Sequence, residues 1–300
     1  MQKKTSLTLQ APPSLPRSLI VTADDFGFGV ATSRGIILAH QAGVVTATSM
    51  MAVTGDHAKK SVPLLADAPE LDVGLHLVLT GENQQAMTTS AKSKLTDRSG
   101  KFHSLKKMLW LSHAGLLHQN EIEDEIAAQA EHCGKLLGKM PAYVDGHHHA
   151  HQLPIVRDAL VAVMNRGLLP KVTRCSAESK MIRKNVPGSK IRRSIANHIS
   201  DRARPLFAKN NIWMNDCCFG MVSLEQLNQP MPWADYFPNL ESDNVVEWFV
   251  HPGELDAELD GRDTYIEGRA RELEIFLELG KSIAWQPWKA RLTTKSKLAR

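Results

Sequence analysis

Ser18-Leu-Ile-Val-Thr-Ala-Asp24-Asp25 is a short apolar run that ends in two adjacent carboxylates, and the pattern recurs along the chain. Three more runs end at an acid or a histidine: residues 71–75 at His76, residues 142–144 at Asp145-Gly-His-His-His-Ala-His151, and residues 245–250 at His251. Apolar runs of this length predict buried parallel strands. The carboxyl ends of parallel strands share one edge of a sheet, so these side chains are expected to meet there.

Helical patterns separate the runs. Apolar side chains recur at three- and four-residue spacing in residues 31–42, which stop at Gly43, and in 57–66, 122–137, 154–164 and 264–279. Further strands are expected at 44–51, 171–175, 217–222 and 282–285. Strands that alternate with helices form parallel sheets with right-handed crossovers. We predict an α/β fold, a single-domain irregular (β/α) barrel of about seven parallel strands with helices outside, rather than an open doubly wound sheet.

Length and composition indicate one large domain. The chain has 300 residues, 43% of them hydrophobic, and barrels commonly take roughly 250 residues as one unit. We predict a flexible, proline-containing lead at 1–17, a folded domain at 18–288 and a basic tail at 289–300. The sequence contains neither an apolar stretch of the ~20 residues that a membrane helix needs nor the apolar core of a signal peptide. We therefore expect a cytoplasmic protein without a transmembrane segment.

Cysteine and charge patterns exclude other classes of protein. The cysteines at 133, 175, 217 and 218 have no paired spacing, which predicts reduced thiols. The net charge of +4 is uneven, because residues 171–209 hold eleven Lys or Arg against Glu178 and Asp201. Such runs are usually solvated loops or, at 289–300, a frayed tail, and the alternative is a surface for an anionic substrate or a membrane headgroup. Nucleic acid is not an expected partner, since this segment has one aromatic residue and no binding motif.

The histidine cluster indicates a metal site. Two imidazoles and a carboxylate with open positions suit a divalent ion that keeps a water, as catalysis requires. In an extended chain Asp145, His147, His149 and His151 would share one face and His148 would point the other way. The alternative is a surface cluster of histidines without function. The acids and histidines at the ends of the other predicted strands argue against it.

The other strand ends have their own alternatives. One carboxylate of Asp24-Asp25 can bind a metal while its neighbour accepts a proton from the bound water, although the pair would also suit a helix cap. His76 lies in an apolar setting where a core histidine is the competing interpretation. His251 could donate a proton to a leaving group or be structural. Trp285 and Trp288 either belong to the core or line a sugar site.

At these residues the chain resembles the YdjC family of carbohydrate deacetylases, which includes chitooligosaccharide deacetylases and hopanoid-associated deacetylase-like proteins. The resemblance covers about residues 19–279 and depends on residues 20–27, 73–79, 144–154 and 250–252. It implies a distorted (β/α) barrel that hydrolyses N-acetyl groups on amino sugars. By position, it implies that Asp25, His76 and His147 hold one divalent ion, Mg²⁺ or Zn²⁺. It further implies that Asp24 is the general base and His251 the general acid.

We therefore expect a metal-dependent hydrolase that removes N-acetyl groups from a chitooligosaccharide-like or glycolipid-linked carbohydrate by metal-activated water. The alternatives are a metal-dependent hydrolase or isomerase of another small polar substrate, and a non-catalytic metal- or sugar-binding protein. Residues 81–105 and 176–215 are expected to determine the substrate, and the basic segment suggests a phosphate- or lipid-linked sugar. The resemblance also makes a homodimer plausible.

Overall fold

The computed structural model describes residues 15–81, 84–88, 94–187, 190–222, 224–255, 259 and 262–300. Most of the predicted lead at 1–17, and part of the segment 81–105, lie outside these residues. The strands are β1 (Ser18–Phe26), β2 (Ala47–Met50), β3 (Asp72–Leu77), β4 (Val144–Gly146), β5 (Val172–Thr173), β6 (Trp213–Met214), β7 (Cys217–Phe219) and β8 (Val245–Val250).

Eleven α-helices and several short 3-10 helices connect or follow the strands within the described residues. The α-helices are α1 (Val30–Gln41), α2 (Asp56–Ser61), α3 (Leu105–His113), α4 (Gln119–Leu137), α5 (Pro154–Asn165), α6 (Lys180–Asn185), α7 (Lys190–Lys209), α8 (Leu224–Leu227), α9 (Ile266–Leu279), α10 (Gln286–Lys289) and α11 (Lys295–Leu298). The 3-10 helices include η1 (Ala52–Thr54), η2 (Val62–Asp67), η3 (His147–Gln152), η4 (Phe237–Asn239) and η6 (Ile283–Trp285). None of the helices in this part of the chain has both the length and the apolar composition needed to cross a membrane.

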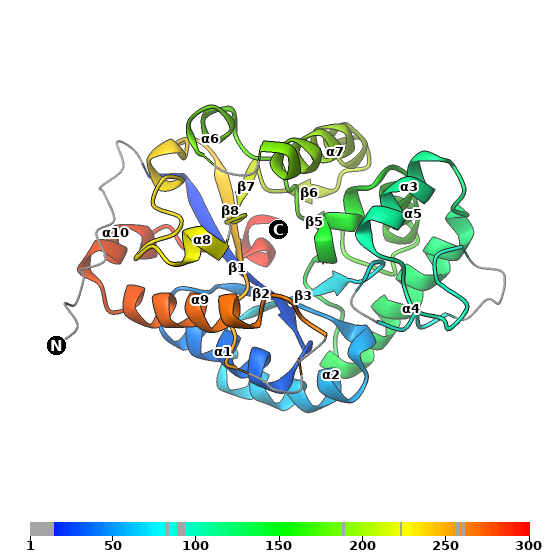
Figure 1. Cartoon of the computed structure of the whole chain (residues 1–300), viewed down its shortest axis with the longest axis horizontal. Helices are drawn as coiled ribbons and strands as arrows, with labels where there is room; N and C mark the ends of the chain where they lie inside the picture. The colour runs from blue at the N-terminus through cyan, green and yellow to red at the C-terminus, as the bar shows by residue number, and fades with distance from the viewer. Residues whose placement is uncertain are drawn as a thin grey trace.

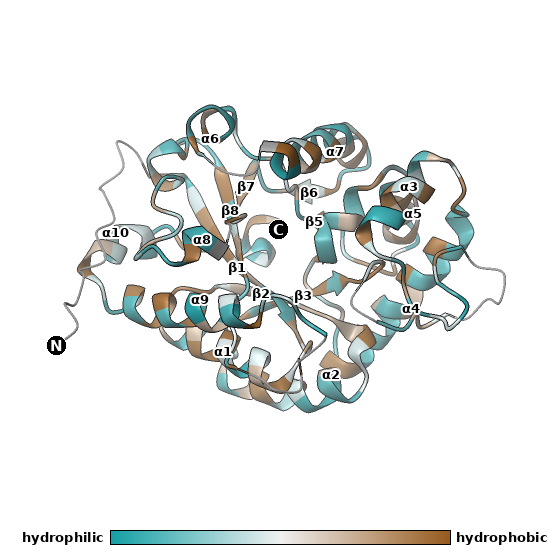
Figure 2. Cartoon of the chain, viewed as in Figure 1, coloured by the Kyte–Doolittle hydropathy of each residue, from teal (hydrophilic) through white to brown (hydrophobic). Residues whose placement is uncertain are grey.

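The strands form one parallel sheet in the order β6-β5-β4-β3-β2-β1-β8-β7. Figure 1 shows the helices arranged around this sheet, with α1 and α9 side by side. The central strands are hydrophobic, whereas the helices alternate hydrophobic and hydrophilic segments along their length (Figure 2). An apolar sheet with amphipathic helices packed on its outside is the α/β barrel-like fold that the sequence predicted.

The edge strands β6 and β7 are two halves of one broken strand. Only Asn215 and Asp216 separate them, yet β6 pairs with β5 and β7 pairs with β8. The Asn215 side chain bridges the break: its amide donates to the carbonyls of Cys175 and Cys217 and its oxygen accepts from the Cys175 N–H. The eight strands therefore occupy seven positions around the barrel, in agreement with the predicted number.

The strand expected at 282–285 is wrong, because these residues form η6. The Ser282 hydroxyl accepts from the Ala284 N–H and caps this turn. The run is apolar because Trp285 enters the core, where its Nε1 donates to the Gly43 carbonyl at 3.1 Å. Trp288 is also buried and packs edge-on against Phe237, so both tryptophans are core residues.

The basic segment is also not the solvated loop that charge runs usually form. It folds into α6 and α7, and Ser179 caps α6 by accepting from the Ile182 N–H at 3.3 Å. Ile182 and Phe207 are buried in the main core, so apolar anchors within the basic run give it a defined structure.

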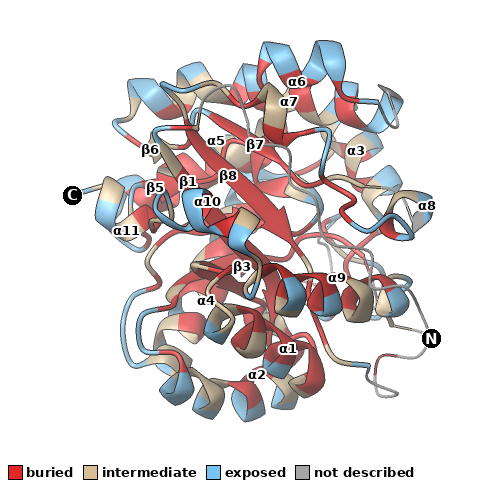
Figure 3. Cartoon of the chain, turned by 90° about the vertical axis from the view of Figure 1, so that its left-hand side faces the viewer, coloured by how far each residue is buried: buried red, intermediate tan, exposed pale blue. Residues whose placement is uncertain are grey.

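Alternating residues of the strands line the barrel interior in layers. The layer nearest the strand starts is an apolar cluster of Ile20, Ala47, Tyr143, Val172 and Val245, separate from the main core between sheet and helices. Leu298 and Ala299 at the chain end pack against it. Figure 3 shows α11 beside β1 and β5. The C-terminal segment thus plugs one end of the barrel, and the interpretation of 289–300 as a frayed tail is wrong.

Candidate metal and catalytic site

β1 continues through both aspartates instead of stopping at them. Asp24 lies two residues beyond Thr22 and four beyond Ile20, so all three share the inward face of the strand. Asp25 has φ 71°, a left-handed conformation that is uncommon for any residue but glycine. Both carboxylates are buried. The helix-cap alternative is wrong, because Gly29 is the N-cap of α1 and no side chain caps that helix.

Three ligand-type side chains converge at this strand end. Asp25 Oδ1 lies 3.2 Å from His76 Nε2 and 3.3 Å from His147 Nδ1. One ligand atom from each residue lies within 4.8 Å of the other two, and all three residues are buried. One carboxylate and two imidazoles at this spacing fit a single divalent ion. The sequence-predicted ligands thus come together from β1, β3 and the turn after β4.

Neighbouring charged residues orient two of the three candidate ligands, His76 and Asp25. His76 Nδ1 lies 2.7 Å from Asp145 Oδ1, which leaves Nε2 directed at Asp25. Such a carboxylate partner is typical of metal-binding histidines. On the other side, Arg269 donates to Asp25 Oδ2 at 2.7 Å. The two neighbours fix the orientation of the His76 ring and the rotation of the Asp25 carboxylate.

Electrostatics favour charged groups here. Burial opposes the charged imidazole of His76, but the nearby Asp145 and Asp24 carboxylates outweigh it and raise its pKa to about 10. Burial likewise disfavours ionised Asp25, but the Arg269 guanidinium and the hydrogen bonds from His147 and His76 together outweigh it and hold the pKa of Asp25 well below its usual range. Without a metal, the protonated imidazole therefore balances the surrounding carboxylates.

Asp24 is held by Arg174, a residue that the sequence did not identify. Arg174 Nη1 and Nη2 donate to the two oxygens of Asp24, both at 2.7 Å. The Ser49 hydroxyl donates to Asp24 Oδ1 at 3.2 Å and lies 3.0 Å from His76 Nδ1. Asp24 is thus a fixed carboxylate directly behind the three-residue cluster.

A cleft of about 240 Å³ opens over the cluster. Asp25, His147 and His251 all line it, whereas Asp24 is not among its lining residues. The backbone N–H of His251 donates to Glu272 Oε2 at 2.6 Å, and the Tyr265 hydroxyl donates to Glu272 Oε1 at 2.7 Å. The structure therefore places His251, at the end of β8, beside the same cleft as the ligand-type residues.

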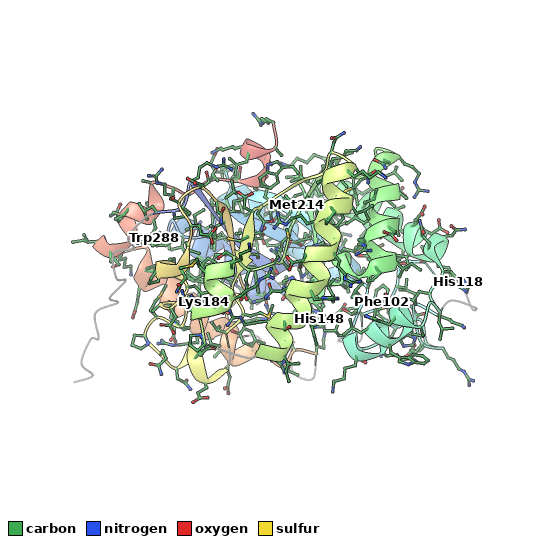
Figure 4. The ribbon with its side chains drawn as sticks, turned by 90° about the horizontal axis from the view of Figure 1, so that it is seen from above. Phe102, His118, His148, Lys184, Met214 and Trp288 are labelled. Carbon is green, nitrogen blue, oxygen red and sulfur yellow. The ribbon has the colours of Figure 1, made fainter. Side chains whose placement is uncertain are left out.

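The expected alternation along the histidine cluster is wrong. His148 and His149 have φ 54° and 56°, so residues 147–152 curl into η3 and do not extend. Figure 4 places His148 near the end of α7, and its Nδ1 lies 2.9 Å from Thr80 Oγ1. The tight turn separates the side chains because two left-handed residues reverse the chain before Pro154 begins α5.

The other cluster members have supporting contacts. His149 Nδ1 lies 3.0 Å from Ser176 Oγ, and His151 Nε2 lies 3.0 Å from the Arg174 carbonyl oxygen. Burial lowers the pKa of His149 well below its usual range and that of His151 to about 4. These two imidazoles are therefore neutral at physiological pH and connect η3 to the end of β5.

Four charged residues around the site were missed from sequence: Arg174, Glu247, Arg269 and Glu272. Glu247 stands in the middle of the fully buried β8, Arg174 directly follows β5, and Arg269 and Glu272 lie on the buried face of α9. Burying a charge is costly unless a partner neutralises it. A charged residue inside an apolar strand or on the apolar face of a helix is the signal that could have identified them.

Comparison with known proteins adds a family context. Residues 18–279 match the model of the family described as YdjC-like protein. A chitooligosaccharide deacetylase of Yersinia pestis (strain Pestoides F) is 39% identical over 160 residues, 52% of this chain and 59% of that protein. The Yersinia pseudotuberculosis protein of the same name (serotype O:1b, strain IP 31758) matches to the same extent. The matched region thus spans less than two thirds of these curated relatives.

A solved structure supports the fold over a longer range. A proposed cellobiose-phosphate cleavage protein of Enterococcus faecalis V583 superposes with a TM-score of 0.76 at 23% identity. The match covers 95% of this chain and 100% of that chain. The likeness extends across the whole barrel.

Proposed function

The chain belongs to the YdjC-like protein family, and we propose that it is a metal-dependent hydrolase that removes N-acetyl groups from an amino-sugar carbohydrate. The observation that carries the proposal is the convergence of Asp25, His76 and His147 beneath a cleft that His251 also lines. The name of the Yersinia relatives supports an oligosaccharide of N-acetylglucosamine as the substrate.

The three converging residues would hold one divalent ion, for which Zn²⁺ and Mg²⁺ are the candidates. When bound, such an ion supplies Lewis-acid chemistry, because it polarises an amide carbonyl and makes water more acidic. Asp145 and Arg269 keep His76 and Asp25 in the required orientation. The site is thereby organised by the protein before any ion enters.

Asp24 is the proposed general base. The two Arg174 hydrogen bonds fix the direction of its carboxylate. Asp24 Oδ1 accepts from both Arg174 and Ser49, whereas Oδ2 accepts from Arg174 and keeps a second lone pair that can accept a proton from water. One oxygen of Asp24 also lies within 4.8 Å of a ring nitrogen of His76, so the proposed base stands beside the candidate ligands.

His251 is the proposed proton donor to the departing amine. It stands at the end of β8, and its backbone is anchored by Glu272, which Tyr265 also contacts. The imidazole packs edge-on against Phe249 and Tyr265 at the wall of the cleft, on a different strand from Asp24. Separate positions for base and acid allow one to take a proton from water while the other protonates nitrogen.

Linkage of the sugar to a phosphate or a lipid remains a prediction for the basic helices α6 and α7. Arg183 pairs with Asp201 and Arg193 pairs with Glu178, so part of the positive charge is neutralised internally. The proposed homodimer likewise remains a prediction.

Acetate release tests the proposed reaction. The metal-depleted protein would be reconstituted with Zn²⁺ or Mg²⁺ and incubated with N-acetylglucosamine oligomers, their phosphorylated forms and a glycolipid. We expect acetate and free amine in equal amounts with at least one metal and none after chelation. Absence of acetate from every substrate with either metal would refute the proposed function.

A further inference from the structure

Lys295 on α11 is fully buried, which is rare for a lysine and demands a compensating charge. Its Nζ lies 2.6 Å from Glu247 Oε1, 3.4 Å from Thr22 Oγ1 and 3.7 Å from the centre of the Tyr143 ring. Lys295 lies beyond residues 18–279, the part that matches the family. The end of the chain thus delivers a positive charge into the barrel interior.

Glu247 receives that charge and shares it with Arg174. Its Oε1 accepts from Thr22 Oγ1 at 2.8 Å, from Arg174 Nε at 2.8 Å and from Lys295 Nζ at 2.6 Å. Glu247 is fully buried, so its charge interacts strongly with both cations. If one cation were removed, the carboxylate would attract the other more strongly.

The remaining nitrogens of Arg174 reach the candidate site. Nη1 and Nη2 donate to Asp24, and Nη2 also lies 2.8 Å from Asp145 Oδ2. The guanidinium is planar, so its Nε contact with Glu247 fixes the direction of the other two nitrogens. One rigid group therefore transmits the position of Glu247 to Asp24.

We infer that Lys295 is a positioning residue for Asp24, acting through Glu247 and Arg174. This inference depends on the proposed function, in which Asp24 is the base. Lys295 balances Glu247 and so leaves Arg174 free to hold Asp24. Without Lys295, the carboxylates of Asp24, Asp145 and Glu247 compete for one guanidinium. The plug at one end of the barrel then influences the reaction at the other.

The test compares K295M with K297M, the same substitution at an exposed position of the same helix. Loss of an outer-shell partner typically lowers activity about 10–100-fold, and we expect K295M to lower kcat within this range. KM and the amount of bound metal should stay at wild-type values, because Lys295 touches neither site. K297M should match the wild type. Wild-type kcat in K295M, or a parallel loss of metal binding, would overturn the inference.

A charge-balanced double variant keeps the test decisive if K295M does not fold. E247Q removes the charge that Lys295 balances, and the glutamine oxygen still accepts from Arg174 Nε. We expect E247Q/K295M to have a higher kcat than E247Q alone, since neither partner is then left as an unpaired buried charge. A further decrease of kcat in the double variant would contradict the proposed charge balance.

A structural readout needs no enzymatic activity. Crystal structures of the wild type and K295M would show whether Arg174 keeps both hydrogen bonds to Asp24. We expect at least one of them to break as the guanidinium shifts toward Glu247. An unchanged Arg174–Asp24 pair would refute the inference. If the wild type released no acetate, the proposed function would fail, and this structural result would still decide the role of Lys295.

Discussion

The two ends of the barrel interior differ in chemistry although the same strands build both. Near the strand starts, Ile20, Tyr143 and Val245 form an apolar layer that the C-terminal segment covers. Four residues further along β1, Asp24 belongs to a layer of paired charges. Alternation along a strand directs every second side chain into the barrel, so one strand supplies stability at one end and reactive groups at the other.

The largest expected effect comes from the charged end. D24N should lower kcat by about 10²–10⁴, the usual contribution of a general base, because the amide cannot accept the proton. Bound metal should remain stoichiometric, since the three ligand-type residues are unchanged. Steady-state kinetics and metal analysis measure the two effects separately. Full activity in D24N would remove Asp24 from the mechanism, and E254Q on the exposed surface ion pair with Arg34 serves as the control.

H251N should have the next largest effect on rate. We expect kcat for an N-acetyl substrate to decrease about 10²-fold, because the amine leaves poorly without a proton. For an aryl acetate ester, whose leaving group needs no proton, the loss should be much smaller. The comparison of the two substrates in wild type and H251N provides the measurement. Equal losses on both would assign His251 to binding and not to proton donation.

Metal binding at the charged end should depend on pH. The pKa of His76 is raised to about 10 in the metal-free protein, so below that pH an entering ion must displace a proton. Affinity should increase about tenfold per pH unit between pH 6 and 8. Calorimetry at pH 8 in buffers of different ionisation enthalpy should detect one released proton. No proton release at this pH would mean that His76 is not protonated in the metal-free protein.

The raised pKa of His76 also affects the stability of the metal-free protein, which should decrease with pH while metal affinity increases. A raised pKa means that the folded state binds the proton more tightly than the unfolded chain. The resulting stabilisation is complete below about pH 6.5 and is lost as pH rises toward 10. Denaturation of the metal-free protein across this range should therefore show a declining free energy of unfolding, and an increase would contradict the charge assignment.

The smallest effect on catalysis is expected at the apolar end. I20A should lower the free energy of unfolding by about 2–5 kcal/mol, the usual result of truncating a buried isoleucine. Its kcat, measured well below the unfolding transition, should stay near the wild-type value because Ile20 is remote from the cleft. Urea denaturation and kinetics on the same preparation make the comparison. A large loss of kcat would show that the two ends are coupled through packing.

Local sequence patterns predicted much of the fold. The apolar run 245–250 coincides with β8, and Pro154 begins α5 as expected from its missing N–H. The strand predicted for the tryptophan-containing run at 282–285 was wrong. Apolar content indicates burial and does not distinguish a strand from a turn that inserts one large side chain. The basic segment 171–209 concealed its two helices because its many charged residues indicate a solvated surface, whereas a few apolar residues such as Ile182 and Phe207 anchor it to the core.

The candidate site was predicted less completely. Asp25, His76 and His147 were visible because each ends or follows an apolar run, and the structure does bring them together. Arg174 and Lys295 were not, since a basic residue near a strand end or a chain end resembles many exposed ones. Both are buried against Glu247, which is 73 residues from Arg174 and 48 from Lys295 in sequence, and local pattern does not report such a distant partner.

The sequence by itself determined the alternation of strands and helices, the family, and the residue types available at the strand ends. Those properties follow from local periodicity and from short motifs, both of which depend on residues that are close together in the sequence. Only the tertiary structure decided which charges pair, that the chain end plugs the barrel, and that Asp24 faces Arg174 and lies outside the cleft lining. These outcomes depend on the tertiary fold, because the barrel-like sheet brings distant side chains into one buried space where every charge needs a partner.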